Sequence, residues 1–143
     1  MSVIYFDSSA LVKLVLDEPG SDIAAQLWNG CDAALSSRLA YPEVCAALTA
    51  ARRNHDLTEP EAIEAATEWE MFWESIRPVE LSADVERAAG QLAPLHNLGG
   101  AHAVHLASAL AIDPAGLTVA VWDRRLHAGA AAAGLAVAPA ELD

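Results

Sequence analysis

Short runs of apolar residues alternate along this chain with longer segments that have helical periodicity. Residues 3–6 form one such run, four consecutive apolar positions, which is typical of a short strand buried on both faces. Residues 117–122 repeat this arrangement near the other end of the chain. Each run is followed directly by an aspartate, Asp7 or Asp123, and then by a helical segment. Both aspartates are therefore expected at the carboxyl end of a strand.

The rest of the pattern predicts further helices and strands in alternation. Apolar residues at helical spacing predict helices over residues 10–16, 21–28, 38–54, 59–76, 83–97, 101–112 and 124–133. Shorter apolar runs predict strands over residues 33–35, 79–81 and 135–137, and residues 113–116 have the composition of a turn. Ser8 or Ser9 is the expected N-cap of the first helix. The alternation predicts an α/β fold with a central, mainly parallel sheet and helices on both faces.

Glu43 interrupts the apolar stripe of the helix predicted over residues 38–54. It falls between Ala40 and Ala47 on the side that this helix is expected to bury. A carboxylate that faces the interior needs a partner, because burial of an unpaired charge is costly. Glu43 is therefore a candidate functional residue.

The composition is that of a compact globular protein. The chain has 143 residues, 54% hydrophobic and 20% charged, which is enough for one full core and too little for two ordinary domains. We therefore expect residues 1–143 to form a single domain. No charged leader with an apolar segment and no run of eighteen apolar residues is present in the sequence. The expectation is a cytoplasmic protein that does not associate with a membrane.

The net charge of −12 limits how this protein can bind nucleic acid. Nonspecific binding by the whole surface depends on clustered lysine and arginine, so the charge argues against it. It does not exclude a nucleic-acid substrate, because a divalent metal held by carboxylates reverses the sign of the local field. An acidic surface would also suit a basic protein partner.

Three carboxylates are expected to meet at one edge of the predicted sheet. Two parallel strands would bring Asp7 and Asp123 to the same edge, and a buried helix face can bring Glu43 beside them. Inward carboxylates without a matching basic residue nearby in sequence are costly unless a cation neutralises them. Hard oxygen ligands favour Mg²⁺ or Mn²⁺. An ion held in this way would orient a water for attack on phosphorus.

Four segments of the sequence resemble, in order, the four motifs of PIN-domain ribonucleases of the VapC toxin type. They are FDSSALVK (residues 6–13), YPEV (41–44), AVHLASA (103–109) and WDRRL (122–126). The resemblance covers essentially the whole chain, as a single PIN domain. It assigns Asp7, Glu43 and Asp123 to the family's first aspartate, its glutamate and its last aspartate, and implies that they bind the metal.

The resemblance also implies the architecture, the activity and the partners. It implies a three-layer PIN-like fold with four or five parallel strands, and RNA cleavage that depends on Mg²⁺ or Mn²⁺. It further implies a homodimer and inhibition by a small cognate antitoxin of the VapB kind. A housekeeping nuclease without an antitoxin is an alternative that the sequence leaves open.

The sequence departs from the family pattern at His102, where the family has a third acidic residue. A neutral imidazole suits Mn²⁺ better than Mg²⁺, and it removes one negative charge from the cluster. His102 is kept as a candidate catalytic residue, with three roles open: a metal ligand, a hydrogen-bond donor to a ligand, or an inert replacement. The departure motivates an alternative function, a catalytically weakened PIN domain that acts by binding RNA or its antitoxin.

Other polar residues in these motifs have simpler interpretations. His105 is interpreted as a hydrogen-bonded core histidine. Ser9 either orients Asp7 or a metal-bound water, or caps the first helix. Lys13, Arg124 and Arg125 are candidates for contact with an RNA backbone, and solvation at the surface is the default interpretation for each.

Overall fold

A parallel sheet of five strands forms the centre of the computed structural model, which describes residues 1–113 and 115–143. The strand order is β3-β2-β1-β4-β5, and every neighbouring pair is parallel. The strands are β1 (Val3–Phe6), β2 (Ala33–Ser37), β3 (Ile76–Val79), β4 (Leu117–Ala120) and β5 (Ala136–Ala138). The predicted α/β fold with a parallel sheet is confirmed.

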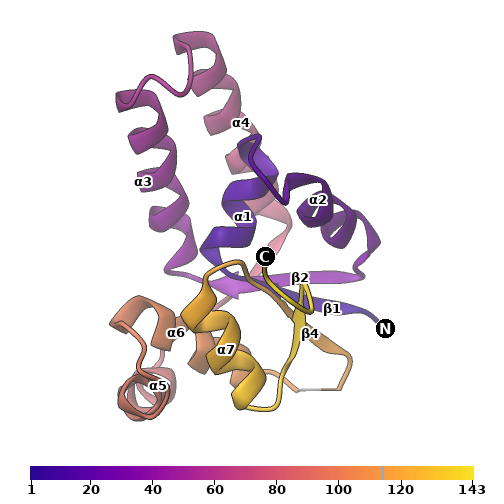
Figure 1. Cartoon of the computed structure of the whole chain (residues 1–143), viewed down its shortest axis with the longest axis vertical. Coiled ribbons are helices and arrows are strands. Elements are labelled where there is room, and N and C mark those ends of the chain that lie inside the picture. The colour runs from indigo at the N-terminus through magenta and orange to yellow at the C-terminus, as the bar shows by residue number, and fades with distance from the viewer. Residues whose placement is uncertain (114) are drawn as a thin grey trace.

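Helices cover both faces of this sheet (Figure 1). One face carries α1 (Ser8–Val15), α2 (Ser21–Gly30), α3 (Ala40–Arg53) and α4 (Glu59–Ser75). The other face carries α5 (Ala83–His96), α6 (Gly100–Leu110) and α7 (Arg124–Ala132). None of the helices within the described residues is both long and apolar enough to cross a membrane.

The central strand β1 contributes to a separate core on each side of the sheet. Tyr5 packs in the core that includes residues of α5, α6 and α7, whereas Ile4 and Phe6 pack in the core that includes residues of α1, α3 and α4. This division follows from the alternation of side chains along a strand. It explains why all four positions of β1 are apolar or aromatic, and it confirms the three-layer arrangement.

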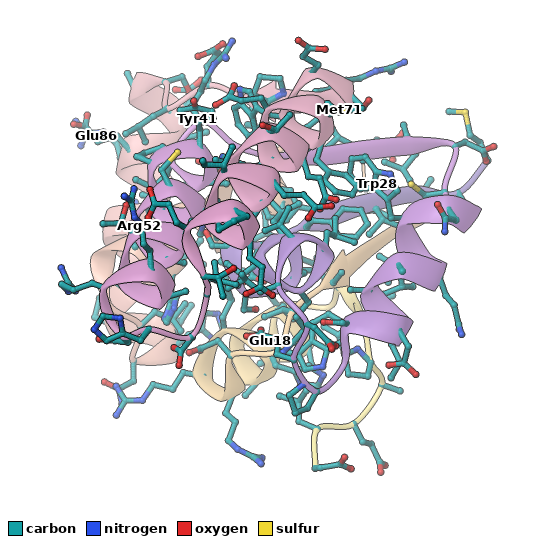
Figure 2. All side chains as sticks on the ribbon, turned by 90° about the horizontal axis from the view of Figure 1, so that it is seen from above. Glu18, Trp28, Tyr41, Arg52, Met71 and Glu86 are labelled. Carbon is teal, nitrogen blue, oxygen red and sulfur yellow. The ribbon has the colours of Figure 1, made fainter. Side chains whose placement is uncertain are left out.

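Aromatic contacts fix the outer layer that contains α3 and α4. Seen from above (Figure 2), Tyr41 lies on α3 beside α4, where its ring stacks on Trp69 with centroids 6.0 Å apart. Trp28 of α2 meets Phe72 of α4 edge-on, with centroids 5.0 Å apart. Such pairs stabilise a contact beyond the apolar area that they bury. They join α2 and α3, the helix that carries Glu43, to α4.

The boundaries of the third strand differ from the prediction. The strand was expected at residues 79–81, after a helix ending at Ile76, but α4 ends at Ser75 and β3 begins at Ile76. Pro78 lies inside this strand, paired with Ser36. Proline is tolerated there because β3 is an edge strand, where a missing N–H does not interrupt the sheet. The predicted turn at residues 113–116 includes residue 114, which lies outside the described residues.

The cap of the first helix is also different from the expected one. Asp7, not Ser8 or Ser9, is the N-cap of α1, and its Oδ1 accepts a hydrogen bond from the Ala10 amide at 3.1 Å. Aspartate is among the strongest N-cap residues, and its extended backbone here allows the helix to begin at the next position. The helix therefore starts two residues earlier than predicted.

The order in which the strands are added to the sheet reverses direction between β1 and β4, which makes this position a topological switch point. From β1 the sheet grows through β2 to β3 on one side, and through β4 to β5 on the other. Phe6 is in register with Ala120, and the Asp7 amide donates to the Ala120 carbonyl at 3.2 Å. Open α/β sheets bind ligands in the crevice outside the carboxyl ends of two such strands. Asp7 and Asp123 follow these two strands.

Candidate metal centre

Asp7 is a buried carboxylate at the end of β1, with only 2% of its surface exposed. Its Oδ1 accepts hydrogen bonds from the Ser9 hydroxyl at 2.6 Å and from the Ala10 amide at 3.1 Å. Burial raises the pKa of Asp7, and attraction to His105 together with these hydrogen bonds opposes the rise only in part. The ionised form of Asp7 is therefore less stable here than in water.

Asp123 stands at the same edge of the sheet, after β4. It is the N-cap of α7, and its Oδ1 accepts a hydrogen bond from the Leu126 amide at 2.9 Å. The Ser9 hydroxyl accepts a hydrogen bond from the Trp122 amide at 2.9 Å while it donates to Asp7. One hydroxyl group therefore links Asp7 to the residue that precedes Asp123.

Glu43 lies in the first turn of α3, with its side chain 27% exposed. Its Oε1 receives hydrogen bonds from the Ser8 hydroxyl and from Nε2 of His105, the latter at 2.6 Å. Burial raises the pKa of Glu43, but hydrogen bonds from His105 and Ser8 and attraction to His105 and His102 outweigh it, so the pKa is lowered. Glu43 is thus held as an ionised group.

Two histidines one turn apart on α6 lie near the three carboxylates. His105 contacts Glu43 and is close enough to Asp7 to lower its pKa. Nε2 of His102 lies 3.7 Å from Oδ2 of Asp123, and His102 also lowers the pKa of Glu43. Residues at positions i and i+3 share a helix face, so α6 presents both imidazoles to the acidic residues.

His105 is the buried hydrogen-bonded histidine that the sequence predicts, with 1% of its surface exposed. Its partners were not predicted: Nδ1 lies 2.7 Å from the Tyr5 hydroxyl, and Nε2 contacts Glu43 and the Ser8 hydroxyl. Sequence analysis missed Ser8 and Tyr5 as parts of this site. Tyr5 did carry a signal, because a phenol in a strand buried on both faces needs a buried hydrogen-bond partner.

The three basic residues that are candidates for RNA contact differ in how far they are paired within the protein. Lys13 forms an ion pair with Glu18 at 3.0 Å and lies over the Trp122 ring, 5.3 Å from its centroid. Arg124 and Arg125 are exposed. Lys13 is therefore already paired with side chains of the protein, whereas the two arginines lie at the surface.

The donor chemistry of the three carboxylates fits a hard divalent cation. Within the described residues, each carboxylate has one oxygen that takes part in no hydrogen bond: Oδ2 of Asp7, Oε2 of Glu43 and Oδ2 of Asp123. Carboxylate oxygens are the ligands that Mg²⁺ and Mn²⁺ prefer. The part of the chain that the structure describes contains no group of three acidic, histidine or cysteine side chains already close enough to hold an ion.

Solved structures with the same fold include proteins of toxin-antitoxin systems. VapC20 of Mycobacterium tuberculosis, described as a sarcin-ricin loop cleaving toxin, aligns with a TM-score of 0.65 at 20% identity, covering 92% of this chain and 95% of that one. A toxin-antitoxin complex from Klebsiella pneumoniae aligns with a TM-score of 0.68 at 17% identity, covering 98% and 99%. At these identities the likeness shows the fold.

Sequence comparison identifies the family. The family model of the PIN domain matches residues 4–127 of the chain. Ribonuclease VapC45 and ribonuclease VapC49, from two strains of Mycobacterium tuberculosis (CDC 1551 / Oshkosh and H37Rv), are each 66% identical over 143 residues, covering 100% of this chain and 99% of theirs. Because both relatives are named ribonucleases, the alternative of a PIN domain that only binds is not favoured. The chain belongs to the PIN domain family, within its VapC type.

Proposed function

We propose that this protein is a toxin ribonuclease that hydrolyses RNA phosphodiester bonds with the help of a divalent metal ion. The observation that carries the proposal is the arrangement of Asp7, Glu43 and Asp123 around α6 at the switch point of the sheet. The names of the relatives VapC45 and VapC49 support an RNA substrate.

The proposed ligands of the ion, Mg²⁺ or Mn²⁺, are Asp7, Glu43 and Asp123. Burial of Asp7 supports this assignment, because a cation would offset the cost of its negative charge. When bound, such an ion supplies a Lewis acid that activates water and stabilises charge on a phosphoryl oxygen. Since Oε1 of Glu43 is occupied by His105 and Ser8, its Oε2 is the oxygen proposed to face the ion.

The residues of the chain have distinct proposed roles around the ion. Ser9 holds Asp7 in one orientation through its short hydrogen bond. Asp7 and Asp123 are the N-caps of α1 and α7, so the positive ends of both helices lie beside these two carboxylates. Helix N-termini favour anionic groups, and here they would also favour the phosphate of the substrate.

The proposed partners are an RNA, a VapB-like antitoxin and a second copy of the chain. Similar structures include a toxin-antitoxin complex from Klebsiella pneumoniae, which supports the antitoxin. The net charge of −12 would suit a basic antitoxin segment. Exposed Leu95 on α5 and Leu110 on α6 offer apolar surface that a homodimer would cover. The proposed location is the cytoplasm, where such RNA and antitoxin would be present.

The function is tested by RNA cleavage with purified protein. Cleavage is expected with Mn²⁺ or Mg²⁺, and it should stop on chelation and return when the metal is restored. Asp7→Asn should lower the rate about 100-fold or more, in the range seen when a preorganised electrostatic group is lost. Asp56→Asn, which changes an exposed carboxylate, is the matched control and should retain the rate. Cleavage that survives both chelation and Asp7→Asn would overturn the proposal.

A further inference from the structure

We infer that His105 is a positioning residue, whose Nε2–H fixes the Glu43 carboxylate at the metal centre while Tyr5 holds the opposite side of the ring. This rests on the proposed function in one respect, the assignment of Glu43 as a metal ligand. His105 itself is buried behind Glu43, so its role is to hold a ligand and not to contact the substrate.

The contact between His105 and Glu43 defines the proton position on the imidazole. Nε2 lies 2.6 Å from Oε1 of Glu43. An ionised carboxylate can only accept a hydrogen bond, so Nε2 must carry the proton. The Ser8 hydroxyl donates to the same Oε1 and lies 3.1 Å from Nε2, so towards His105 it can act only as an acceptor. Both neighbours of Nε2 therefore require an N–H group there.

The opposite side of the ring is set by Tyr5. Its hydroxyl lies 2.7 Å from Nδ1, in the core beneath the sheet edge. Burial, together with the charge of Asp7, raises the pKa of Tyr5 well above its ordinary value, so the phenol keeps its proton. The phenol can donate to Nδ1 when the ring is neutral and accept from Nδ1–H when the ring is charged. In both forms Nε2 carries a proton and donates to Glu43.

The hydrogen bonds from His105 and Ser8 restrict the Glu43 side chain before any metal binds. A free glutamate side chain has several rotamers, and ordering it costs free energy when it binds an ion. Because His105 and Ser8 hold Oε1, the side chain of Glu43 is already partly ordered when the protein folds, so less free energy is lost when the ion binds. Oε2 remains available to the metal. Groups that hydrogen-bond to metal ligands typically change metal affinity about 10- to 100-fold when they are removed.

The first test measures Mn²⁺ affinity by electron paramagnetic resonance, without any substrate. His105→Leu should weaken Mn²⁺ binding about 10-fold or more. His105→Gln should retain much of the affinity, because its amide N–H can replace Nε2–H. Val85→Ala shortens a buried side chain on α5 away from the carboxylates, so it controls for lower stability and should bind Mn²⁺ normally.

The comparison with Glu43→Gln separates two kinds of failure. If Glu43→Gln weakens Mn²⁺ binding and His105→Leu does not, the positioning role is wrong and the proposed ligand set stands. If Glu43→Gln binds Mn²⁺ as tightly as the unchanged protein, the ligand set is wrong, and the inference is overturned with it. Loss of affinity in both variants, with recovery in His105→Gln, supports the inference.

A second test uses the unchanged metal-free protein, so it does not depend on whether a variant folds. Nitrogen-15 NMR at neutral pH should show a proton on Nε2 of His105. A spectrum with the proton on Nδ1 alone would overturn the inference.

Discussion

The Ser9 hydroxyl accepts a hydrogen bond from the Trp122 amide at 2.9 Å, across the switch point between β1 and β4. The same hydroxyl donates to Asp7 at 2.6 Å. Of the interpretations of Ser9 that the sequence left open, capping is wrong, because Asp7 caps α1. The contact with Asp7 agrees with the interpretation that Ser9 orients this aspartate.

Loss of this hydroxyl should destabilise the protein. We expect Ser9→Ala to lower the free energy of unfolding by roughly 1–3 kcal/mol, because the Trp122 amide would lose its partner. Urea unfolding measures the change. Thr67→Ala, which removes an exposed hydroxyl bonded within α4, is the control and should stay within about 0.5 kcal/mol. Equal effects of the two variants would contradict the prediction.

Asp7→Asn should stabilise the metal-free protein while it removes activity. The pKa of Asp7 is raised in the folded state, so folding is favoured at low pH, where the group is neutral. Stability is then lost as the pH rises from the ordinary value of 3.8 through the raised folded pKa. Asparagine can keep the cap without this charge. Thermal unfolding at neutral pH should show a higher Tm for Asp7→Asn than for the unchanged chain, and a lower Tm would be contrary to expectation.

Glu43→Gln should have the opposite pH dependence. The pKa of Glu43 is lowered on folding, so its ionised form adds stability above the ordinary value of 4.5, and this is lost as the pH falls through the folded pKa. Near neutral pH we expect Glu43→Gln to cost roughly 1.5 kcal/mol or more, since hydrogen bonds to a charged group are lost. Unfolding experiments at a series of pH values measure this cost. The loss of stability in Glu43→Gln should disappear in acid, where the carboxyl is neutral. A loss of stability that does not change with pH would show that it does not come from the ionised carboxylate.

His102→Asp should change the preferred metal. His102 faces Asp123 at 3.7 Å, and an imidazole suits Mn²⁺ better than Mg²⁺. A carboxylate at this position adds a hard oxygen donor, so Mg²⁺ affinity should rise about 10-fold or more, on the scale of changes around metal ligands. Calorimetric titration with each ion gives both affinities. An unchanged ratio would indicate that His102 has no part in choosing the ion.

Gly20→Ala should be destabilising for two independent reasons. Gly20 has φ = +95°, and an added Cβ would lie 2.8 Å from Nε1 of Trp122. Left-handed backbone at a residue other than glycine costs about 1 kcal/mol or more, and the contact adds to it. Gly30→Ala is the control, because nothing lies within 4 Å of its added Cβ. Chemical unfolding of both variants is the measurement, and a neutral Gly20→Ala would contradict the structure.

Much of the fold follows from local sequence pattern. The apolar runs at residues 3–6 and 117–122 contain β1 and β4, the two adjacent strands that precede Asp7 and Asp123. Parallel pairing then brings Asp7 and Asp123 to one edge without further information. The edge strand β3 was misplaced because Pro78 resembles a helix terminator, and only its position at the edge of the sheet makes it compatible with a strand.

The partners of Glu43 could not be read from the sequence. Ser8 is 35 positions away, His105 is 62 positions away from Glu43, and Tyr5 is 100 positions from His105. These contacts depend on how α3 and α6 pack against the sheet, which periodicity does not specify. The stripe position of Glu43 did predict that it needs a partner, but not which one.

The pairing of β1 with β4 joins the first strand of the chain to the fourth. During synthesis, Asp7 and Glu43 leave the ribosome well before Asp123 is made, and the sheet stays open beside β1 until then. Contacts so distant in sequence form late and slowly. A growing polypeptide can therefore bring Asp7, Glu43 and Asp123 together only after β4 and the start of α7 have been made.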